Sequence, residues 1–441
     1  MPKSKGRKRS RGAARRPRPA VRSRKPDEPL IPPIDGLVRS VLRGGRELLE
    51  VEDPLEAELW ASSILGTSYK LPIPLDARDE LERSLGPAIV EGAERAADAE
   101  RLAILRALAA VADGELSAAA HQAAERLAAR AVPDPVWTAG IGRPRFVDAW
   151  VLADPYDDQL CYYATFRYPG RPPHTVTALF DENLGGIVKD AFAGIPTGDP
   201  RSRAEREPGA RVSDAEPGLM AARIIHAIET GDRYLDNDWT REFKQTRALL
   251  LSRMRLLPAV PPPEPPPPLE DDARAALTAE FLASEHAPAL EETGSIVRHC
   301  LDSRCDFGDG DPLRWSPIVV ELFMLDYLPR KATLDTREIR ALPDVLRGWV
   351  RFALTKRGLE ERWVAEAEGA VNRFAPAFRR AVTDPSRFGP AKAIANAMLA
   401  AGVDLTDQRA VNAWIADFNA RPQEAREGLL GELPLPEYLR P

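Results

Sequence analysis

Three side chains between residues 158 and 174 have the types that nucleophilic catalysis requires. Cys161 supplies a thiol, His174 an imidazole and Asp158 a carboxylate. A cysteine nucleophile needs a base within hydrogen-bond reach and a third group that orients the base. Cys161 and His174 lie on two neighbouring predicted strands, which antiparallel pairing brings side by side. The alternation of side chains, however, puts Cys161 on the face opposite Tyr162. A hydrolase-type site that uses His174 with Cys161 or a nearby carboxylate such as Asp158 is one of two functional hypotheses.

A second group of chemically capable residues, His299, Cys300 and Cys305, predicts no metal site. Zinc takes four nitrogen or sulfur ligands, usually from close pairs, and no second Cys/His pair exists in the sequence. Asp306 begins an acidic turn, but Gly308 stands where a calcium loop needs its second ligand. The motifs of phosphate-binding loops, dinucleotide folds, α/β-hydrolases and zinc proteases are absent. We therefore expect buried cysteines, no metal and no cofactor.

Charge is strongly segregated along the 441 residues, although the net charge is only -6. Twelve of the 61 basic residues lie in residues 1–25, so residues 26–441 hold 49 basic and 67 acidic residues and have a net charge of -18. The twelve cations of residues 1–25, which contain no acid, are Lys3, Lys5, Arg7, Lys8, Arg9, Arg11, Arg15, Arg16, Arg18, Arg22, Arg24 and Lys25. This asymmetry indicates a polyanionic partner or attraction between the two parts.

Residues 1–33, which we call the basic tail, are too polar and too rich in proline to form a core, so we predict that they are disordered. Their cations can release counterions from a nucleic-acid backbone and give salt-sensitive, sequence-independent binding. The nine cations from Lys3 to Arg18 are the candidate contacts. The tail has no Phe, Tyr or Trp, so base stacking does not contribute.

The apolar runs and the cysteines of the chain indicate its compartment. The tail is not succeeded by the apolar run of a secretory signal, and the longest apolar run, 318–328, is too short to span a bilayer. Three cysteines are an odd number and suit reduced thiols. A cytoplasmic protein without membrane contact is expected.

The patterns predict an α+β protein that is predominantly α-helical. Residues 34–132 form a helical region, in which Asp53-Pro54 begins a helix and 98–112 and 115–131 form two more. Residues 133–257 form an α+β module. Its runs 146–153, 160–168 and 174–180 predict a three-stranded antiparallel meander, covered on one face by helices at 217–230 and 239–256, with a long loop around 197–216.

Residues 258–268 contain eight prolines and predict a stiff spacer between domains. Beyond it, residues 269–441 have helical periodicity and predict a bundle. Within this domain, Pro343 is expected to open a helix and Pro376 to kink or break the segment 359–382.

Three segments carry a resemblance to a known family. They are Asp53-Pro-Leu-Glu-Ala-Glu-Leu-Trp, Asp181-Glu-Asn-Leu-Gly-Gly-Ile-Val-Lys-Asp-Ala-Phe, and Trp315-Ser-Pro through Asp326-Tyr-Leu-Pro-Arg-Lys. They resemble a protein family of high-GC Gram-positive (actinobacterial) bacteria that has no assigned activity. The resemblance covers most of the chain after the tail and implies a bacterial cytoplasmic setting and one shared architecture.

The second functional hypothesis, which we favour, is a non-catalytic interaction protein. Its helical surfaces would bind another protein, and its tail would associate with nucleic acid without sequence preference. The modular layout and the missing catalytic motifs favour this hypothesis over the hydrolase.

Overall fold

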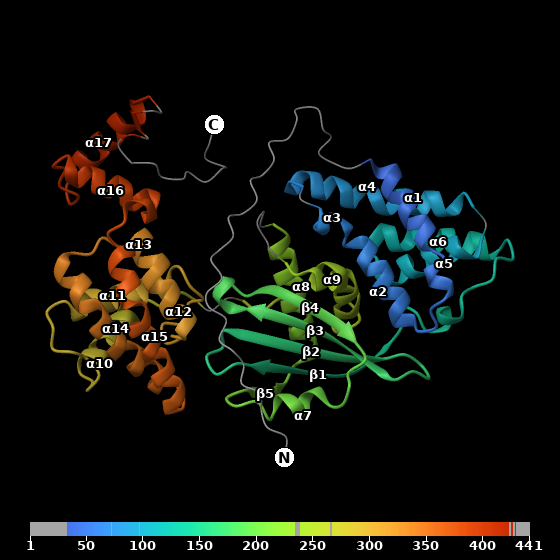
Figure 1. Cartoon of the computed structure of the whole chain (residues 1–441), viewed down its shortest axis with the longest axis horizontal. Coiled ribbons are helices and arrows are strands. Elements are labelled where there is room, and N and C mark those ends of the chain that lie inside the picture. The colour runs from blue at the N-terminus through green and yellow to red at the C-terminus, as the bar shows by residue number, and fades with distance from the viewer. Residues whose placement is uncertain are drawn as a thin grey trace, which may run out of the picture.

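The computed structural model describes residues 33–422, except 72, 97, 234–238 and 265–266, together with 425, 426 and 428. It has helices in its N-terminal part, a sheet in the middle and a second group of helices in its C-terminal part (Figure 1). The predicted class, α+β and predominantly α-helical, is confirmed. Residues 1–32 lie outside the described residues, so a disordered tail that binds nucleic acid stays a prediction.

The N-terminal helices pack around a core of alanine and leucine side chains. Asp53 accepts a hydrogen bond from the Leu55 N–H at 3.0 Å and Pro54 occupies the first turn, which confirms the predicted helix start. Asp98 caps the next predicted helix in the same way. The helices are α1 (Ile34–Gly44), α2 (Pro54–Leu65), α3 (Thr67–Lys70), α4 (Leu75–Glu94), α5 (Ala99–Val111) and α6 (Gly114–Ala128).

The sheet is antiparallel throughout, in the order β4-β3-β2-β1-β5. The predicted meander is confirmed, but the sheet has five strands because β4 and the short β5 were missed. One of these, β5, and a short helix lie in the stretch predicted as a long loop, where charged residues hid them. The elements are β1 (Arg145–Ala153), β2 (Gln159–Arg167), β3 (Pro173–Asp181), β4 (Ile187–Gly194), α7 (Pro200–Ala204) and β5 (Arg211–Asp214).

Helices α8 (Pro217–Asp232) and α9 (Arg241–Met254) cover one face of the sheet, as predicted (Figure 1). Alternate residues of the central strands, among them Phe166 and Val176, pack against them. Helix α9 also contacts α2, so it lies between the sheet and the N-terminal helices. At this crossing the Ser62 hydroxyl accepts from the Leu249 N–H at 3.0 Å and donates to the Gln245 carbonyl at 2.6 Å. It thus inserts into the hydrogen-bond ladder of α9.

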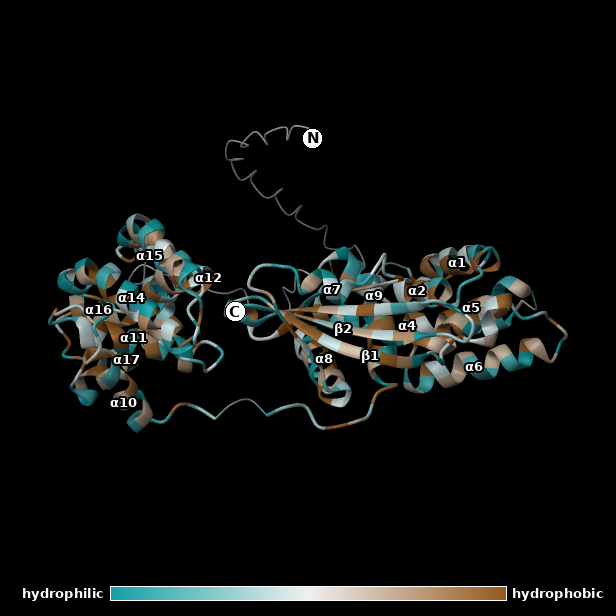
Figure 2. Cartoon of the chain, turned by 90° about the horizontal axis from the view of Figure 1, so that it is seen from below, coloured by the Kyte–Doolittle hydropathy of each residue, from teal (hydrophilic) through white to brown (hydrophobic). Residues whose placement is uncertain are grey.

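The proline-rich stretch carries no helix or strand where it is described, and Figure 2 shows it as an extended chain leading into α10. Beyond it, the C-terminal helices enclose their own core, in which Trp349 meets Phe281 edge to face at 5.2 Å. The helices around this core are α10 (Asp271–Leu282), α11 (Thr293–Cys305), α12 (Pro317–Leu322), α13 (Leu328–Lys331), α14 (Thr336–Lys356) and α15 (Glu361–Ala381). They are followed by α16 (Pro390–Ala400) and α17 (Gln408–Ala420).

The structure contradicts a helix start at Pro343 and a break at Pro376. Pro343 lies inside α14, which begins seven residues earlier at a capping box formed by Asp335 and Glu338. Pro376 lies inside α15, which continues to Ala381. In both helices the buried stripe on either side of the proline packs into the C-terminal core, and this packing offsets the lost backbone hydrogen bond.

No helix in the described part of the chain is long and apolar enough to cross a membrane.

Two glycines in neighbouring helices predict opposite responses to alanine. A Cβ on Gly348 would lie 2.1 Å from the His286 carbonyl oxygen, whereas Gly369 has no neighbouring atom within 4 Å. We expect Gly369→Ala to raise the free energy of unfolding by about 0.5–1 kcal/mol through helix propensity. We expect Gly348→Ala to lower it by about 3 kcal/mol, since backbone must move. Urea titrations of both variants check this, and equal effects would contradict the close packing at Gly348.

Candidate functional site

His174 lies at the start of β3, on the helix-covered face of the sheet and opposite Phe166 of β2. Only 1% of the residue is exposed. Its ring stacks on Tyr168 at 4.9 Å between centroids and on Phe166 at 6.1 Å. The imidazole is therefore sealed by aromatic side chains and does not face a cavity.

Cys161 and Asp158 are not brought to His174. Cys161 pairs with Leu179 on β3, five residues along the strand from the Phe166–His174 pair, which corresponds to about 17 Å. Strand alternation also puts Cys161 on the other face of the sheet, as predicted. Burial raises the pKa of its thiol to about 11, so the thiolate that a nucleophile needs is disfavoured. Asp158 lies in the turn before β2, nearer Cys161 than His174.

His174 instead belongs to a buried network that joins the N-terminal helices to the sheet. The Arg253 guanidinium on α9 forms an ion pair with Glu58 on α2, and both side chains are fully buried. The Tyr168 hydroxyl donates to the same Glu58 carboxylate at 2.6 Å, and the Gly142 N–H donates to its other oxygen at 2.7 Å. Arg253 Nε donates to His174 Nε2 at 3.3 Å. Both charges are thus paired and hydrogen-bonded, as buried charges must be.

Burial and the adjacent Arg253 charge lower the pKa of His174 to about 3. The ring is then neutral at neutral pH, and its Nε2 accepts a hydrogen bond while Nδ1 carries the proton. Nδ1 is buried and has no hydrogen-bond partner in the described residues. A neutral, sealed histidine that accepts from an arginine orients that arginine and does not act as a general base.

Sequence reasoning missed Glu58 and Arg253, although a signal was present. Arg253 follows Leu249 and Leu250 at four and three residues, and Glu58 follows Leu55 at three, so each charge falls on an apolar helix face. Charged residues at such positions are almost never buried unless they are paired. Two of them of opposite sign on different helices indicate a buried ion pair.

The turn between β1 and β2 docks onto the C-terminal helices. Tyr156 packs into their core, and its hydroxyl donates to the Trp363 carbonyl at 2.8 Å. Asp158 pairs with Arg314 at 2.5 Å, and both are buried. Arg357 binds Asp157 at 2.6 Å. Burial raises the pKa of Asp158, opposed by a hydrogen bond to Ser316 and by the Arg314 charge. Asp158 is therefore an interface residue.

A cavity of about 390 Å³ lies beside this interface. It is lined by the segment after β3, the end of α11, and the run from α12 to α13. Glu182, Asn183 and Gly185 come from the sheet module, and the other lining residues come from the C-terminal part of the chain. The latter are Ser303, Arg304, Phe307, Gly308, Val319, Leu322, Phe323, Asp326, Tyr327, Arg330 and Lys331.

A π-helical turn, η4 (Phe323–Tyr327), forms one wall of this cavity. The Leu328 N–H donates to the Phe323 carbonyl five residues back. Pro329, the next residue, has no N–H for the Leu325 carbonyl, which accepts from Arg387 at 3.4 Å instead. Single π-helical turns of this kind occur frequently at functional sites.

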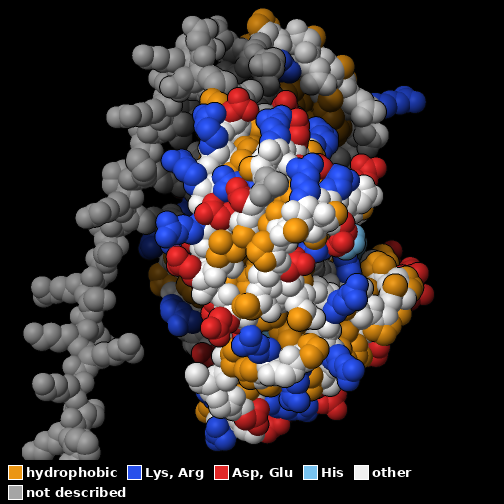
Figure 3. Space-filling model, turned by 90° about the vertical axis from the view of Figure 1, so that its right-hand side faces the viewer, with side chains coloured by type: hydrophobic (Ala, Val, Ile, Leu, Met, Phe, Trp, Pro, Cys, Tyr) orange, Lys and Arg blue, Asp and Glu red, His pale blue; other side chains and the backbone are white. Residues whose placement is uncertain are grey.

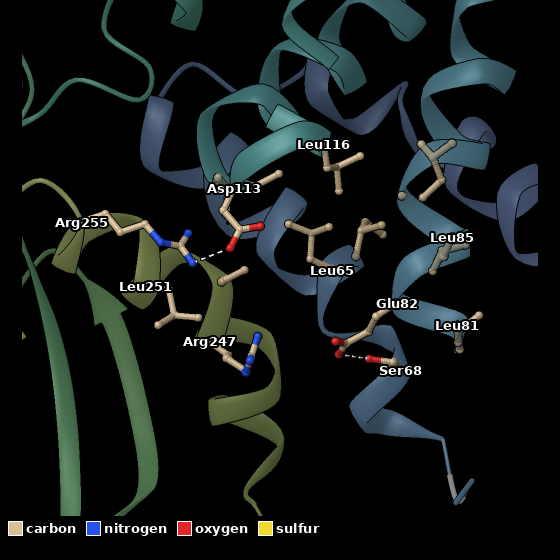
Figure 4. Close-up of a pocket in the computed structure, with 16 residues that line it drawn as sticks. Leu65, Ser68, Leu81, Glu82, Leu85, Asp113, Leu116, Arg247, Leu251 and Arg255 are labelled. Carbon is tan, nitrogen blue, oxygen red and sulfur yellow. Dashed lines mark hydrogen bonds and ion pairs between the residues drawn. The ribbon is translucent and has the colours of Figure 1, made fainter. Parts of the chain in front are cut away.

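A second, smaller cavity of about 150 Å³ lies among α2, α4, α9 and the α5–α6 connection (Figure 4). Leucines line its middle. Arg255 pairs with Asp113 at 2.6 Å on one side, and Ser68 donates to Glu82 at 2.7 Å on the other. Arg247 also lines this cavity and pairs with Asp232, but the buried Arg247 Nε has no hydrogen-bond partner in the described residues.

The cysteines and acidic residues of the C-terminal helices do not converge. Cys300 is fully buried in the core, Cys305 is half-buried, and Asp306 and Asp302 pair with Arg274. Within the described residues, no three His, Cys, Asp or Glu side chains are grouped to hold a metal ion.

Comparison with protein-family models, curated protein sequences and solved structures finds no match for this chain.

The buried ion pair predicts a strongly non-additive double-mutant cycle. Glu58→Gln or Arg253→Met alone leaves one charge buried without compensation, which lowers the free energy of unfolding by about 3–5 kcal/mol. The double variant should lose clearly less than the sum of the two, since both charges are gone. Urea titrations measure all three, with the exposed pair Arg46–Glu50 as a matched control that changes little. Additive losses would contradict coupling within the network.

His174 predicts a stability difference that depends on pH. Its folded pKa, about 3, is below the ordinary 6.5, so the unfolded chain takes up the proton first as pH falls. The contribution of His174 to the free energy of unfolding is complete above pH 6.5. It decreases progressively toward pH 3, by up to ~1.4 kcal/mol per pH unit. His174→Gln should remove this dependence, so that the loss of stability between pH 7 and 5 is smaller by about 2 kcal/mol.

Urea titrations at the two pH values measure this difference. His226→Gln, which replaces an exposed histidine on α8, is the matched control. An equal pH response of the two variants would show that the burial of His174 has no electrostatic consequence.

Proposed function

We propose that this chain is a non-catalytic, cytoplasmic interaction protein of bacterial origin that associates with nucleic acid through its basic tail. The observation that carries the proposal is the charge pattern of residues 1–25, which hold twelve cations and no acid. A cluster of cations of this kind binds the phosphates of a nucleic-acid backbone and does not discriminate between base sequences.

The pairing of charges on the rest of the chain supports this assignment. On the face shown in Figure 3, formed by the N-terminal helices, basic and acidic side chains are intermingled. Arg106 there binds Glu125 and Asp134, and Arg126 binds Glu94. Cations that already have carboxylate partners attract phosphate weakly. Residues 1–25 offer twelve basic side chains without an acid among them, and are therefore the best candidate for binding a polyanion.

The burial of the candidate catalytic residues favours a binding role over the alternative hydrolase. His174 is sealed, and Cys161 and Asp158 lie away from it. The three free thiols, Cys161, Cys300 and Cys305, suit a reducing compartment and support the cytoplasmic assignment. A protein partner for the helical surfaces belongs to the same proposal.

A charge-neutralised tail tests the nucleic-acid proposal in the full-length chain. The variant replaces Arg7, Lys8, Arg9, Arg11, Arg15 and Arg16 with glutamine. Binding to labelled duplex DNA and single-stranded RNA is measured by fluorescence anisotropy between about 50 and about 200 mM salt. We expect at least a tenfold loss of affinity at the lower salt. We also expect the slope of log K against log salt to become shallower by up to ~5, since each duplex phosphate contact contributes ~0.9.

A second variant provides the matched control, with six exposed arginines of the body replaced by glutamine, which preserves helix propensity. These are Arg39, Arg83, Arg373, Arg379, Arg380 and Arg409. It has the same net charge as the tail variant, so a general charge effect would weaken binding equally in both. Equal binding by the wild type and both variants, or equal loss in both, would overturn the proposal.

A further inference from the structure

The cavity beside the interface has the size and position of a ligand site. Its volume of about 390 Å³ falls in the range of small-molecule sites, which occur preferentially where domains meet. Segments on both sides of the proline-rich stretch line it. Glu182 and Asn183 precede the stretch, and residues 303–331 follow it.

One wall of the cavity is a group of aromatic rings. Phe323 stacks on Tyr327 at 5.7 Å, and Tyr327 lies 5.6 Å from Phe307. Phe307 is 60% exposed, so its ring is accessible to a ligand in the cavity. A planar ring placed against Phe307 and Tyr327 would cover it and gain a stacking interaction.

The charged side chains that line the cavity favour a negatively charged ligand. Arg330 pairs with Asp326 at 3.0 Å, Glu182 pairs with Arg223, and Arg304 pairs with Asp309. Lys331 lies over the Phe307 ring at 4.6 Å and has no carboxylate within ion-pair distance in the described part of the chain. The lining thus has three cations against two acids, in a body whose net charge is strongly negative.

Two buried polar atoms on lining residues also lack partners. The Asn183 Oδ1 and the Arg304 Nε make no hydrogen bond within the described residues. A buried donor or acceptor without a partner costs free energy, and such groups in native proteins call for an explanation. An acceptor from the sheet side and a donor from α11 match the two kinds of group that the edge of a heterocycle carries.

We propose that this cavity binds a mononucleotide. The base would stack on Phe307 and Tyr327, with Asn183 and Arg304 toward its edge, and the phosphate would bind Lys331 beside Arg330. The π-helical turn places Asp326 and Tyr327 on the cavity wall. This proposal does not rest on nucleic-acid binding by the basic tail.

Calorimetric titration of the full-length chain tests the proposal with three probes: adenosine monophosphate, adenosine and inorganic phosphate. The nucleotide should bind saturably with one site per chain, and the two fragments at least tenfold more weakly. Lys331→Gln should weaken the nucleotide about tenfold, the scale of one charge-assisted contact, and leave adenosine unchanged. Phe307→Leu should weaken the nucleotide and adenosine alike, since it removes the stacking surface.

Two matched variants distinguish the site from the rest of the surface. Lys356→Gln removes a lysine near another aromatic ring, Phe352, and Phe192→Leu removes an exposed phenylalanine from the sheet. Both should leave the titrations unchanged, and all four variants should keep the wild-type unfolding midpoint.

If inorganic phosphate binds as tightly as the nucleotide, the cavity is an anion site and does not recognise the base. That result, no saturable nucleotide binding, or equal weakening by Lys356→Gln would overturn the proposal. Fluorescence anisotropy with labelled DNA tests the tail proposal separately from the cavity proposal, since Lys331→Gln should not change the affinity for DNA.

Discussion

The ion pair between Glu58 and Arg253 is the interaction on which the arrangement of the N-terminal helices and the sheet depends. Removing two charges from water costs several kcal/mol per ion, and the structure offsets this by hydrogen bonds from Tyr168 and the Gly142 backbone. The residues come from α2, α9 and the end of β2, so the pair is complete only when helices and sheet are in register. The ion pair and the two Ser62 hydrogen bonds to the α9 backbone are directional, so they fix the position of α9 against α2 in a way that apolar packing alone does not.

The same network explains why a residue of catalytic type is not catalytic here. His174 is neutral because it lies beside a cation in a dry environment, and its acceptor nitrogen is used by Arg253. Asp158 is likewise used to hold Arg314 across an interface. Residue type and spacing indicate chemistry only while the side chain remains accessible and unpaired. The Lys331 ammonium, which has no carboxylate partner in the described residues, lies elsewhere, at the cavity between the sheet and the C-terminal helices.

Local patterns predicted most of the fold, because caps, alternation and helical periodicity are local signals. The Asp53 cap, the meander and the two helices on its face were all predicted from the sequence. Pro343 was misread because a capping box upstream and buried neighbours outweigh one missing hydrogen bond. Local patterns could not predict the buried ion-pair network or the cavity. Glu58 and Arg253 are 195 residues apart, and the residues around the cavity come from both sides of the proline-rich stretch, so only tertiary structure brings them together.

The docking of the β1–β2 turn links the cavity to the rest of the molecule. Tyr156 and Asp158 hold the sheet module against the C-terminal helices, and the Arg314 that binds Asp158 also donates to the Glu182 carbonyl at 3.4 Å. Glu182 lines the cavity. The proline-rich connection keeps the two partners at high effective concentration, so docking is intramolecular. A ligand that contacts both sides must stabilise the docked arrangement, and by linkage the docking contacts must strengthen its binding by the same factor.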